Sequence, residues 1–384
     1  MLPYFAPWLT QNVWGPFRLL GSHLILIGLG ATAAAILTFL CILRWQHRLA
    51  RDGGRPHTPT PEAALGKPTG AGLFMVCTAL IVLAFVLPSS QRLWQMIGCL
   101  FLAMVTGLLD DSSGQPWGEL KKGVFDLLIC LATAAVFCQG EPVTIWLPLT
   151  TEEFAIPPVA YTLGAGALLW ICINATNCTD GVDGLAGSLT LLSLLYLGAF
   201  LYMVVGHQDV AEYLLIPHNA NGARWAILVF TSAGALAGYL WHNAEPSAVL
   251  MGDAGSRFLG LLVGICVLAT GNPVLIIVVA PVVLINGGTG LVKLALLRMM
   301  GALGMDIRMR IKPPGHPEPP GASAPLPDEP PQWWLVRWLH NVRFPLHDHC
   351  RRRLGWSNAQ VLLRFMLIQA FATPVFLAIV VKLR

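Results

Sequence analysis

Aspartates occur in three short segments whose composition suits metal and phosphate chemistry. Asp110 and Asp111 are adjacent, and Asp180 and Asp183 lie within NATNCTDGVDG. Asp253 lies in MGDAGS, between two glycines. Carboxylates are ligands that Mg²⁺ prefers, and glycines leave backbone amides open to a phosphate at a helix N-terminus. These segments therefore predict a site for a divalent metal and for phosphate groups.

Each of these segments also has a structural alternative. Asp183 or Asp253 could cap the helix that follows it. Asp110 and Asp111 could form a solvated helix end, although adjacent carboxylates there repel each other and oppose the helix dipole. A cap at Asp183 would explain one polar residue of its segment and leave the neighbouring asparagines and threonines unexplained.

Two further polar segments could serve the same chemistry. PLHDH contains His347 and His349, which could bind a metal or stabilise the charge of a phosphate, and KPTGAG places Thr69 in a turn. Either segment could be incidental, because histidines in a basic loop and Pro-Thr-Gly linkers are common. Together with the carboxylates, these two segments would supply groups that bind a metal and phosphates. Such groups suit phosphoryl transfer, because its catalysis is mostly positioning and charge stabilisation.

The composition places these segments in a membrane protein. The 384 residues are 55% hydrophobic and 11% charged, with a mean hydropathy of +0.64, whereas soluble domains carry about 25% charged residues. A chain this apolar needs the bilayer as its solvent. It has no Walker A motif and no GxGxxG opening a βαβ unit, so a soluble nucleotide-binding fold is not expected.

Apolar runs of about 20 residues predict an all-α polytopic membrane protein with about ten transmembrane helices. The expected spans are 22–44, 71–88, 92–110, 123–138, 159–175, 185–205, 224–241, 256–270, 274–299 and 362–382. The run 123–138 is weak because it carries Asp126. We expect one membrane domain over 1–384, with a Pro-rich loop insertion at 312–332.

The basic residues predict which side faces the cytoplasm. Lysines and arginines gather in the connections 45–70, 111–122 and 300–361, whereas 139–158 and 206–223 contain none. The positive-inside rule therefore places both termini outside and all the polar segments on the cytoplasmic side. We accordingly expect a cytoplasmic active-site cleft. After the insertion, a tryptophan cluster that begins at Trp333 predicts a helix lying on the membrane surface.

These motifs together resemble the polyprenyl-phosphate N-acetylhexosamine-1-phosphate transferase family. The resemblance covers nearly the whole chain, through the Pro-Thr turn, Asp110-Asp111, NATNCTDGVDGLAG, GYLWHNAEPSAVLMGDAGS, and PLHDH followed by GWSNAQVLLRF. It implies a ten-helix fold, outside termini and a cytoplasmic cleft. The last motif favours the branch of the family that acts on UDP-MurNAc-pentapeptide.

The resemblance also implies roles for individual residues. Asp253 is expected to bind Mg²⁺, and Asp180 is the second candidate metal ligand. Asp110 and Asp111 are expected near the lipid phosphate, as candidates for its deprotonation, and they form the catalytic set with Asp253 and His347. The expected substrate-binding residues are Thr69, Lys122, Asn174, Asn177, Asp180, Asp183, Asn243, Leu250 and His349.

The implied reaction is attack by undecaprenyl phosphate on the sugar-linked phosphate of UDP-MurNAc-pentapeptide, giving lipid I and UMP. Mg²⁺ would neutralise the diphosphate. This is a step of peptidoglycan synthesis at the bacterial cytoplasmic membrane. A direct attack and a route through an enzyme-bound phosphosugar both fit the sequence, and the resemblance is compatible with a homodimer.

The sequence departs from the pattern of that branch at three positions. Asp348 is in the middle of the usual three histidines, Leu250 replaces an aromatic residue that stacks on uracil, and Gly114 replaces a lysine. These departures leave two alternatives open. One is a related transferase that uses another UDP-N-acetylhexosamine, such as UDP-GlcNAc. The other is a catalytically weakened homologue that acts as a membrane scaffold.

Overall fold

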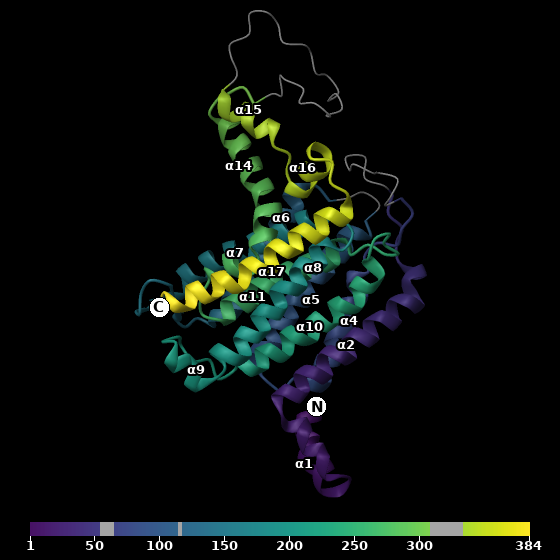
Figure 1. Cartoon of the computed structure of the whole chain (residues 1–384), viewed down its shortest axis with the longest axis vertical. Coiled ribbons are helices and arrows are strands. Elements are labelled where there is room, and N and C mark those ends of the chain that lie inside the picture. The colour runs from purple at the N-terminus through teal and green to yellow at the C-terminus, as the bar shows by residue number, and fades with distance from the viewer. Residues whose placement is uncertain (54–64, 114–116, 308–332) are drawn as a thin grey trace, which may run out of the picture.

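The apolar runs fold into long helices in the computed structural model, which describes residues 1–53, 65–113, 117–307 and 333–384 (Figure 1). Eight helices of the described chain are long and apolar enough to cross a membrane. They are α2 (His23–Trp45), α5 (Gln91–Asp111), α7 (Pro158–Thr179), α8 (Leu185–Phe200) continued by a π-helical turn at Leu201–Val205, α10 (Gly222–Asn243), α11 (Gly252–Ala269), α14 (Thr289–Ala302) together with the helical turns that precede it from Pro281, and α17 (Asn358–Lys382). The all-α polytopic prediction is thereby confirmed.

The other two predicted spans are also helical. The helix α4 (Gly72–Val86) has 15 residues, and α6 (Glu119–Cys138) carries Asp126 and three further charged residues. Both features set these helices apart from the eight. The exact number of spans and the placement of the termini outside remain predictions. The predicted insertion at 312–332 and the Gly114 departure lie outside the described residues.

Several predicted span boundaries were wrong. The run 274–299 is broken into α12 (Leu275–Val279), α13 (Pro281–Val283) and a π-helical turn at Leu284–Gly288 before α14. Proline lacks an amide hydrogen and cannot continue the α12 ladder, so the membrane-length segment begins at Pro281. In addition, α11 begins at Gly252 rather than 256, and α7 extends to Thr179 rather than 175.

Shorter elements complete the chain. They are α1 (Leu2–Asn12), a 3₁₀ helix at Gly15–Gly21, another at Gln46–Arg48, α9 (Gln208–Tyr213), α15 (Trp334–Asn341), α16 (Leu346–Arg353) and the strands β1 (Val143–Trp146) and β2 (Glu153–Ile156). The helix predicted after the insertion is α15, which packs Val336 and Leu339 against Met300 of α14 and leaves Trp334 73% exposed. Its location on a membrane surface remains a prediction.

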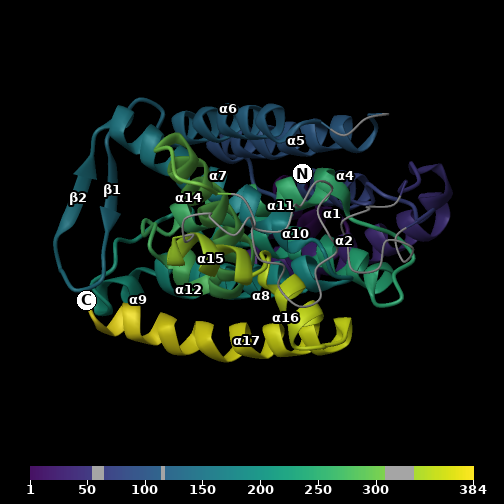
Figure 2. The same cartoon turned by 90° about the horizontal axis from the view of Figure 1, so that it is seen from above.

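The helix α11 forms the centre of the bundle. Figure 2 shows it between α5 and α6 on one side and α8 and α17 on the other. Every residue of α11 except Asp253 is buried. Because α11 is buried on every side, its single more open position, in its first turn, is where the core meets the polar residues.

Glycines let two neighbouring helices approach the first turn of α11. A Cβ atom at Gly72 would lie 2.3 Å from the Gly255 Cα, and one at Gly107 would lie 2.4 Å from the Asp253 carbonyl oxygen. These nearest atoms belong to the backbone of α11, which cannot move aside as the end of a flexible side chain can. The close contacts of α4 and α5 with α11 therefore require glycine at both positions.

Gly107→Ala should lower stability, because the added methyl group overlaps the α11 backbone. Overpacking of this kind costs about 1–3 kcal/mol. Gly98→Ala is the matched control: Gly98 lies on the same helix with nothing within 4 Å of its would-be Cβ, so alanine there should be neutral or slightly stabilising. Thermal unfolding in detergent would measure both, and equal midpoints would contradict the close packing.

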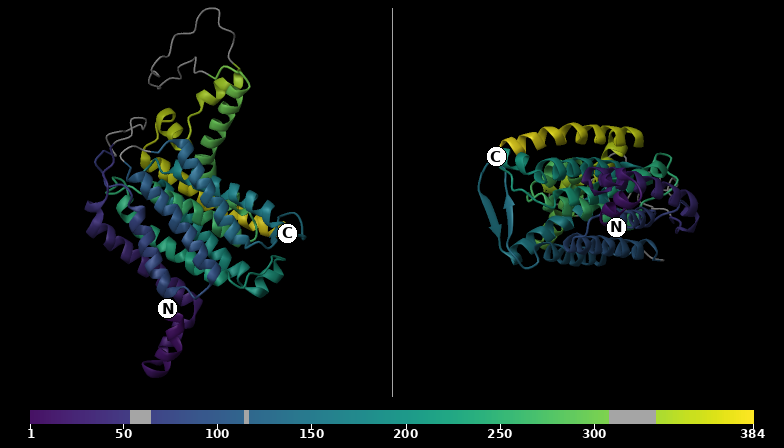
Figure 3. Two further views of the ribbon diagram at one scale, coloured as in Figure 1. Left: turned by 180° about the vertical axis from the view of Figure 1, so that it is seen from behind. Right: turned by 90° about the horizontal axis from the view of Figure 1, so that it is seen from below.

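The far end of α11 is held by the two-stranded sheet. The strands are antiparallel, with Val143 opposite Ile156. Trp146 is fully buried, its backbone amide donates to the Gly271 carbonyl at 2.9 Å, and its indole Nε1 donates to the Thr270 carbonyl. Figure 3 shows the sheet beside the C-terminus of the chain. The sheet lies at the opposite end of α11 from Asp253.

Candidate active site

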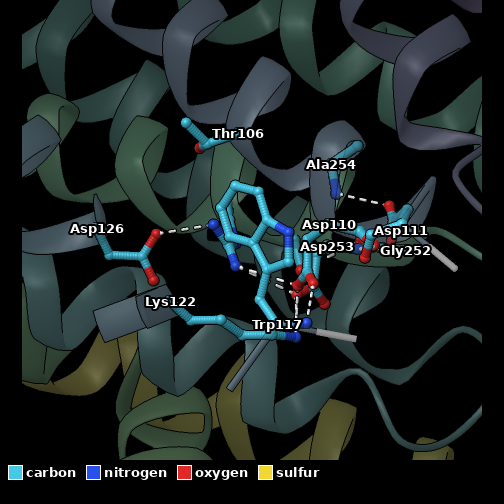
Figure 4. A network of polar contacts seen from close by, with 12 residues as sticks. Thr106, Asp110, Asp111, Trp117, Lys122, Asp126, Gly252, Asp253 and Ala254 are labelled. Carbon is cyan, nitrogen blue, oxygen red and sulfur yellow. Dashed lines mark hydrogen bonds and ion pairs between the residues drawn. The ribbon is translucent and has the colours of Figure 1, made fainter. Parts of the chain in front are cut away.

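Two carboxylates and a lysine meet at the first turn of α11 (Figure 4). The Lys122 ammonium lies 2.5 Å from Asp110 Oδ2 and 2.9 Å from Asp253 Oδ2. The backbone amide of Trp117 donates to the other Asp110 oxygen at 2.8 Å. The side chains of Lys122 and Asp253 are 30% and 14% exposed, against 3% for Asp110. Lys122 and Asp253 are therefore the members that a substrate can reach.

A buried arginine joins this group from the next turn of α11. Arg257 is fully buried, and its Nη2 lies 3.4 Å from Asp110 Oδ2 and 3.3 Å from Asp253 Oδ2. Its Nη1 lies 3.2 Å from Asp126 Oδ1 on α6. Arg257 was absent from the predicted site, and Asp126 entered the prediction only as a weakness of its span. The sequence did contain a signal for both residues, because a charged side chain within an apolar run is costly unless it is paired with an opposite charge.

Asp111 points away from this group and accepts backbone hydrogen bonds. Its two oxygens accept from the amides of Asp253 and Ala254, at 2.9 and 3.0 Å. It therefore caps the N-terminus of α11 from the end of α5, where the helix dipole favours a negative charge. The alternative in which Asp253 caps α11 is wrong, because it is the carboxylate of Asp111 that accepts from these amides.

Asp111→Ala should destabilise the protein by about 1–2 kcal/mol, the usual effect of losing a cap. Asp111→Asn keeps one acceptor oxygen and should lose less. The effect would be measured as a shift of the thermal unfolding midpoint in detergent, with Glu152→Ala, which removes an exposed carboxylate outside any helix, as the control. An alanine variant as stable as wild type would show that the cap contributes nothing.

A second polar network holds the segment after α7. The Lys67 ammonium donates to Ser247 Oγ at 2.9 Å and lies 3.6 Å from Asp183 Oδ2. The Ser247 amide donates to the same Asp183 oxygen at 3.1 Å. Asp183 thus links two loops, and the alternative in which it caps α8 is wrong, because the capping position is Gly184 and has no side chain.

Asn243, predicted to bind substrate, is buried within this network. Its Oδ1 accepts from the Gly184 amide at 2.8 Å, and its Nδ2 donates to the Val249 carbonyl at 2.9 Å. Both ends of the amide are therefore used to fix the loops. The geometry indicates that Asn243 shapes the second network rather than presenting a free group to a ligand.

A third network surrounds His347 on α16. The amide of His347 donates to Asn286 Oδ1 at 2.8 Å, and the Asn286 Nδ2 donates to Thr179 Oγ1 at 3.1 Å. A Cβ at Gly181 would lie 2.5 Å from His347 Nε2, so the imidazole rests on that glycine. Burial, together with the positive charge of Arg351, lowers the pKa of His347 to about 4. The imidazole is therefore neutral at physiological pH.

The other two members of the histidine motif lie nearer the surface. Asp348 Oδ2 lies 3.5 Å from the guanidinium Nε of Arg352, one turn along α16. His349 Nδ1 accepts from the Arg343 amide at 3.3 Å, and its pKa is lowered by burial and by the nearby arginines. The aspartate between the histidines is thus accommodated by an ion pair.

The remaining predicted residues lie on the segments that connect the networks. The Leu250 amide donates to the Pro68 carbonyl at 2.8 Å. This hydrogen bond joins the Pro-Thr turn, which contains Thr69, to the start of α11. Asp180 directly follows α7 and precedes the glycine under His347. Asn174 and Asn177 are within α7 rather than in a loop, and Asn174 Nδ2 donates to its own helix at the Trp170 carbonyl.

The donor set at α11 fits a hard divalent cation. The group contains four carboxylates (Asp110, Asp111, Asp126 and Asp253) and two cations (Lys122 and Arg257), a formal charge of −2. Within the described residues, no three His, Cys, Asp or Glu side chains are placed to hold a metal by themselves. Mg²⁺ is usually held by one or two carboxylates together with substrate phosphates, which suits Asp253.

Fold and site together define the class: a polytopic membrane enzyme with a charged site at one end of its bundle. The sequence model described as Glycosyl transferase family 4 matches residues 93–271. The phospho-N-acetylmuramoyl-pentapeptide-transferase of Treponema pallidum (strain Nichols) is 41% identical over 375 residues, covering 97% of this chain and 94% of that protein. The protein of that name from Campylobacter lari is 26% identical, with 89% of each chain covered.

The chain therefore belongs to the phospho-N-acetylmuramoyl-pentapeptide-transferase family. The Helicobacter pylori protein of the same name is 26% identical over 275 residues, or 67% of this chain. The family suggested by the motifs is confirmed. The motifs in the matched region 93–271 include the residues that the fold gathers around α11.

Proposed function

We propose that the protein transfers phospho-MurNAc-pentapeptide from UDP-MurNAc-pentapeptide to undecaprenyl phosphate, giving lipid I and UMP. The observation that carries the proposal is the group of Asp110, Asp253, Lys122 and Arg257 at the open end of a buried helix. The names of the relatives support the choice of substrate. Family membership also weakens the scaffold alternative, because these relatives are named as transferases.

In this reaction an oxygen of the lipid phosphate attacks the sugar-linked phosphorus, and UMP leaves with the electrons of the broken P–O bond. Asp253 and Lys122, the two reachable members of the group, would contact the substrate phosphates. Asp110 is nearly buried and engaged by three donors, so its geometry favours holding Lys122 in place. Mg²⁺, bound through Asp253 and the substrate, would supply charge neutralisation to the diphosphate.

The second and third networks suit the nucleotide half of the substrate. Lys67 and Asp183 lie near the end of α7, where Asn177, in the last turn of that helix, and Asp180, directly after it, are the proposed nucleoside and diphosphate contacts. His347 is neutral, so at a phosphate it would act as a hydrogen-bond donor rather than as a cation. Thr69 and His349 remain proposed substrate contacts on the flanking segments.

The proposed setting is the bacterial cytoplasmic membrane, with the site on the cytoplasmic face. The support is the charge asymmetry of the connections and the position of all three networks away from the β1–β2 sheet, whose loop contains no lysine or arginine. Homodimerisation remains a prediction of the family resemblance.

Leu250→Phe should lower the KM for the UDP-sugar. The family resemblance gives this position an aromatic residue that stacks on uracil, and a base–aromatic stack is worth about 1–3 kcal/mol, or roughly 5- to 150-fold in KM. Leu250 is only partly buried, so a larger ring can be accommodated. Leu250→Met is the control for size without aromaticity. A KM unchanged in Leu250→Phe would mean that uracil does not lie beside this residue.

The sugar nucleotide is the point on which the main alternative differs. Purified protein in detergent, with undecaprenyl phosphate and Mg²⁺, would be given radiolabelled UDP-MurNAc-pentapeptide or UDP-GlcNAc. Label extracted into butanol from the first substrate alone supports the proposal. Label from UDP-GlcNAc alone would reassign the protein to the related transferases, and no label from either in a folded sample would support the scaffold alternative.

A further inference from the structure

The buried pair formed by Asp126 and Arg257 is not used by any step described above. It lies directly behind the reachable carboxylate: Arg257 Nη1 faces Asp126 Oδ1 at 3.2 Å, and Arg257 Nη2 faces Asp253 Oδ2 at 3.3 Å. Figure 4 shows Asp126 on one side of Asp110 and Asp253, opposite Asp111. Asp126 and Arg257 are 2% and 0% exposed, so neither touches the substrate directly.

Arg257 fixes which oxygen of Asp253 is presented. Arg257 and Lys122 both point at Oδ2 of Asp253, as they do at Oδ2 of Asp110. The hydrogen bonds that Lys122 and Arg257 donate to the Asp253 carboxylate both end on Oδ2. The two cations therefore hold the carboxylate by one oxygen, and this fixes the direction in which the other oxygen points.

Arg257 alone would carry an electrostatic disadvantage for metal binding. With Asp110 and Asp253 opposed by Lys122 and Arg257, the four charges sum to zero, and the Asp111 carboxylate is occupied by the amides of α11. Asp126 adds the negative charge that offsets Arg257. The arginine can then orient Asp253 without cancelling the charge that attracts a divalent cation.

We propose that Asp126 and Arg257 are positioning residues that orient Asp253 and set the affinity of the site for its divalent cation. This rests on the proposed function. The two residues should then affect metal binding in opposite directions while both support turnover. A pair that served only stability would leave metal affinity unchanged. Changes to groups just behind a metal ligand typically alter affinity or activity roughly 10–100-fold.

The test uses the full-length protein in detergent with UMP present, and Mn²⁺ as the probe, with free Mn²⁺ measured by electron paramagnetic resonance. Asp126→Asn is nearly isosteric and should raise the Mn²⁺ dissociation constant roughly tenfold. Arg257→Gln should lower that constant, because a positive charge is removed, yet lower kcat. The double variant should return the constant to near the wild-type value while kcat stays low.

Glu119→Gln is the matched control, because Glu119 lies on the same helix as Asp126 but its side chain is 80% exposed. It should leave both Mn²⁺ binding and kcat unchanged. A wild-type Mn²⁺ constant in folded Asp126→Asn would overturn the proposal even if Arg257→Gln does not fold. Tighter Mn²⁺ binding by Asp126→Asn would overturn it as well. Failure of the proposed function would appear separately, as wild-type protein without lipid product.

Discussion

Asp253→Asn is expected to reduce Mg²⁺-dependent turnover by roughly a hundred- to thousandfold, the usual loss when one preorganised electrostatic contact is removed from an active site. Asp253 is the one residue of α11 that is not buried, and its carboxylate is the reachable negative group of the site. Asparagine keeps the shape but carries no charge. UMP release measured against Mg²⁺ concentration would show a lower maximal rate.

The Asp253 variant must remain folded for this result to be interpretable. Its amide is still bound by Asp111, and Arg257 keeps Asp110 and Asp126 as partners, so the unfolding midpoint should change little. Asp209→Asn, an exposed carboxylate on α9, is the control and should keep full activity. An active Asp253→Asn or Asp253→Ala enzyme that still depends on Mg²⁺ would rule out Asp253 as the metal ligand.

Arg257→Met is expected to destabilise the protein by about 3–5 kcal/mol, the typical effect of removing one partner from a buried ion pair. Arg257 is fully buried and faces carboxylates on α5, α6 and its own helix. Without it, Asp126 loses its ion-pair partner in the core. Thermal or chemical unfolding in detergent would measure the loss.

Replacing both Asp126 and Arg257 by apolar residues separates the effect of an unpaired buried charge from the effect of altered packing. Asp126→Leu combined with Arg257→Met should recover much of the lost stability, because a buried pair is often replaceable by apolar residues of similar volume. Arg298→Met is the exposed control: its pair with Glu119 lies on the surface, where ion pairs contribute about 0–1 kcal/mol. A double variant no more stable than Arg257→Met would contradict the assigned pairing.

The helices were predictable because the bilayer imposes one signal, a long apolar run, on every span. The break in the run 274–299 was not predictable, because hydropathy does not show where Pro281 interrupts the ladder of backbone hydrogen bonds. That break also forms the π-helical turn that places Asn286 against His347. Asn286 was absent from the predicted site for this reason.

The polar segments could be found from composition, but the contact that each of their residues makes could not be predicted. Asp110 and Asp111 are adjacent in sequence, yet one meets Lys122 and the other caps α11. Successive residues of a helix point in different directions, and which neighbour each one meets depends on how the helices pack. The charge of Arg257 was visible in the sequence, but two of its partners, Asp110 and Asp126, come from other helices and could not be named for the same reason.

The central claim is best tested by the stoichiometry of products. Purified protein in detergent would be given UDP-MurNAc-pentapeptide, undecaprenyl phosphate and Mg²⁺, and UMP and lipid-linked phosphosugar would be quantified in the same samples. We expect one UMP for each lipid product, and no sustained release of UMP when undecaprenyl phosphate is omitted. Release of UDP in place of UMP, or sustained UMP release without the lipid acceptor, would contradict phosphosugar transfer at this site.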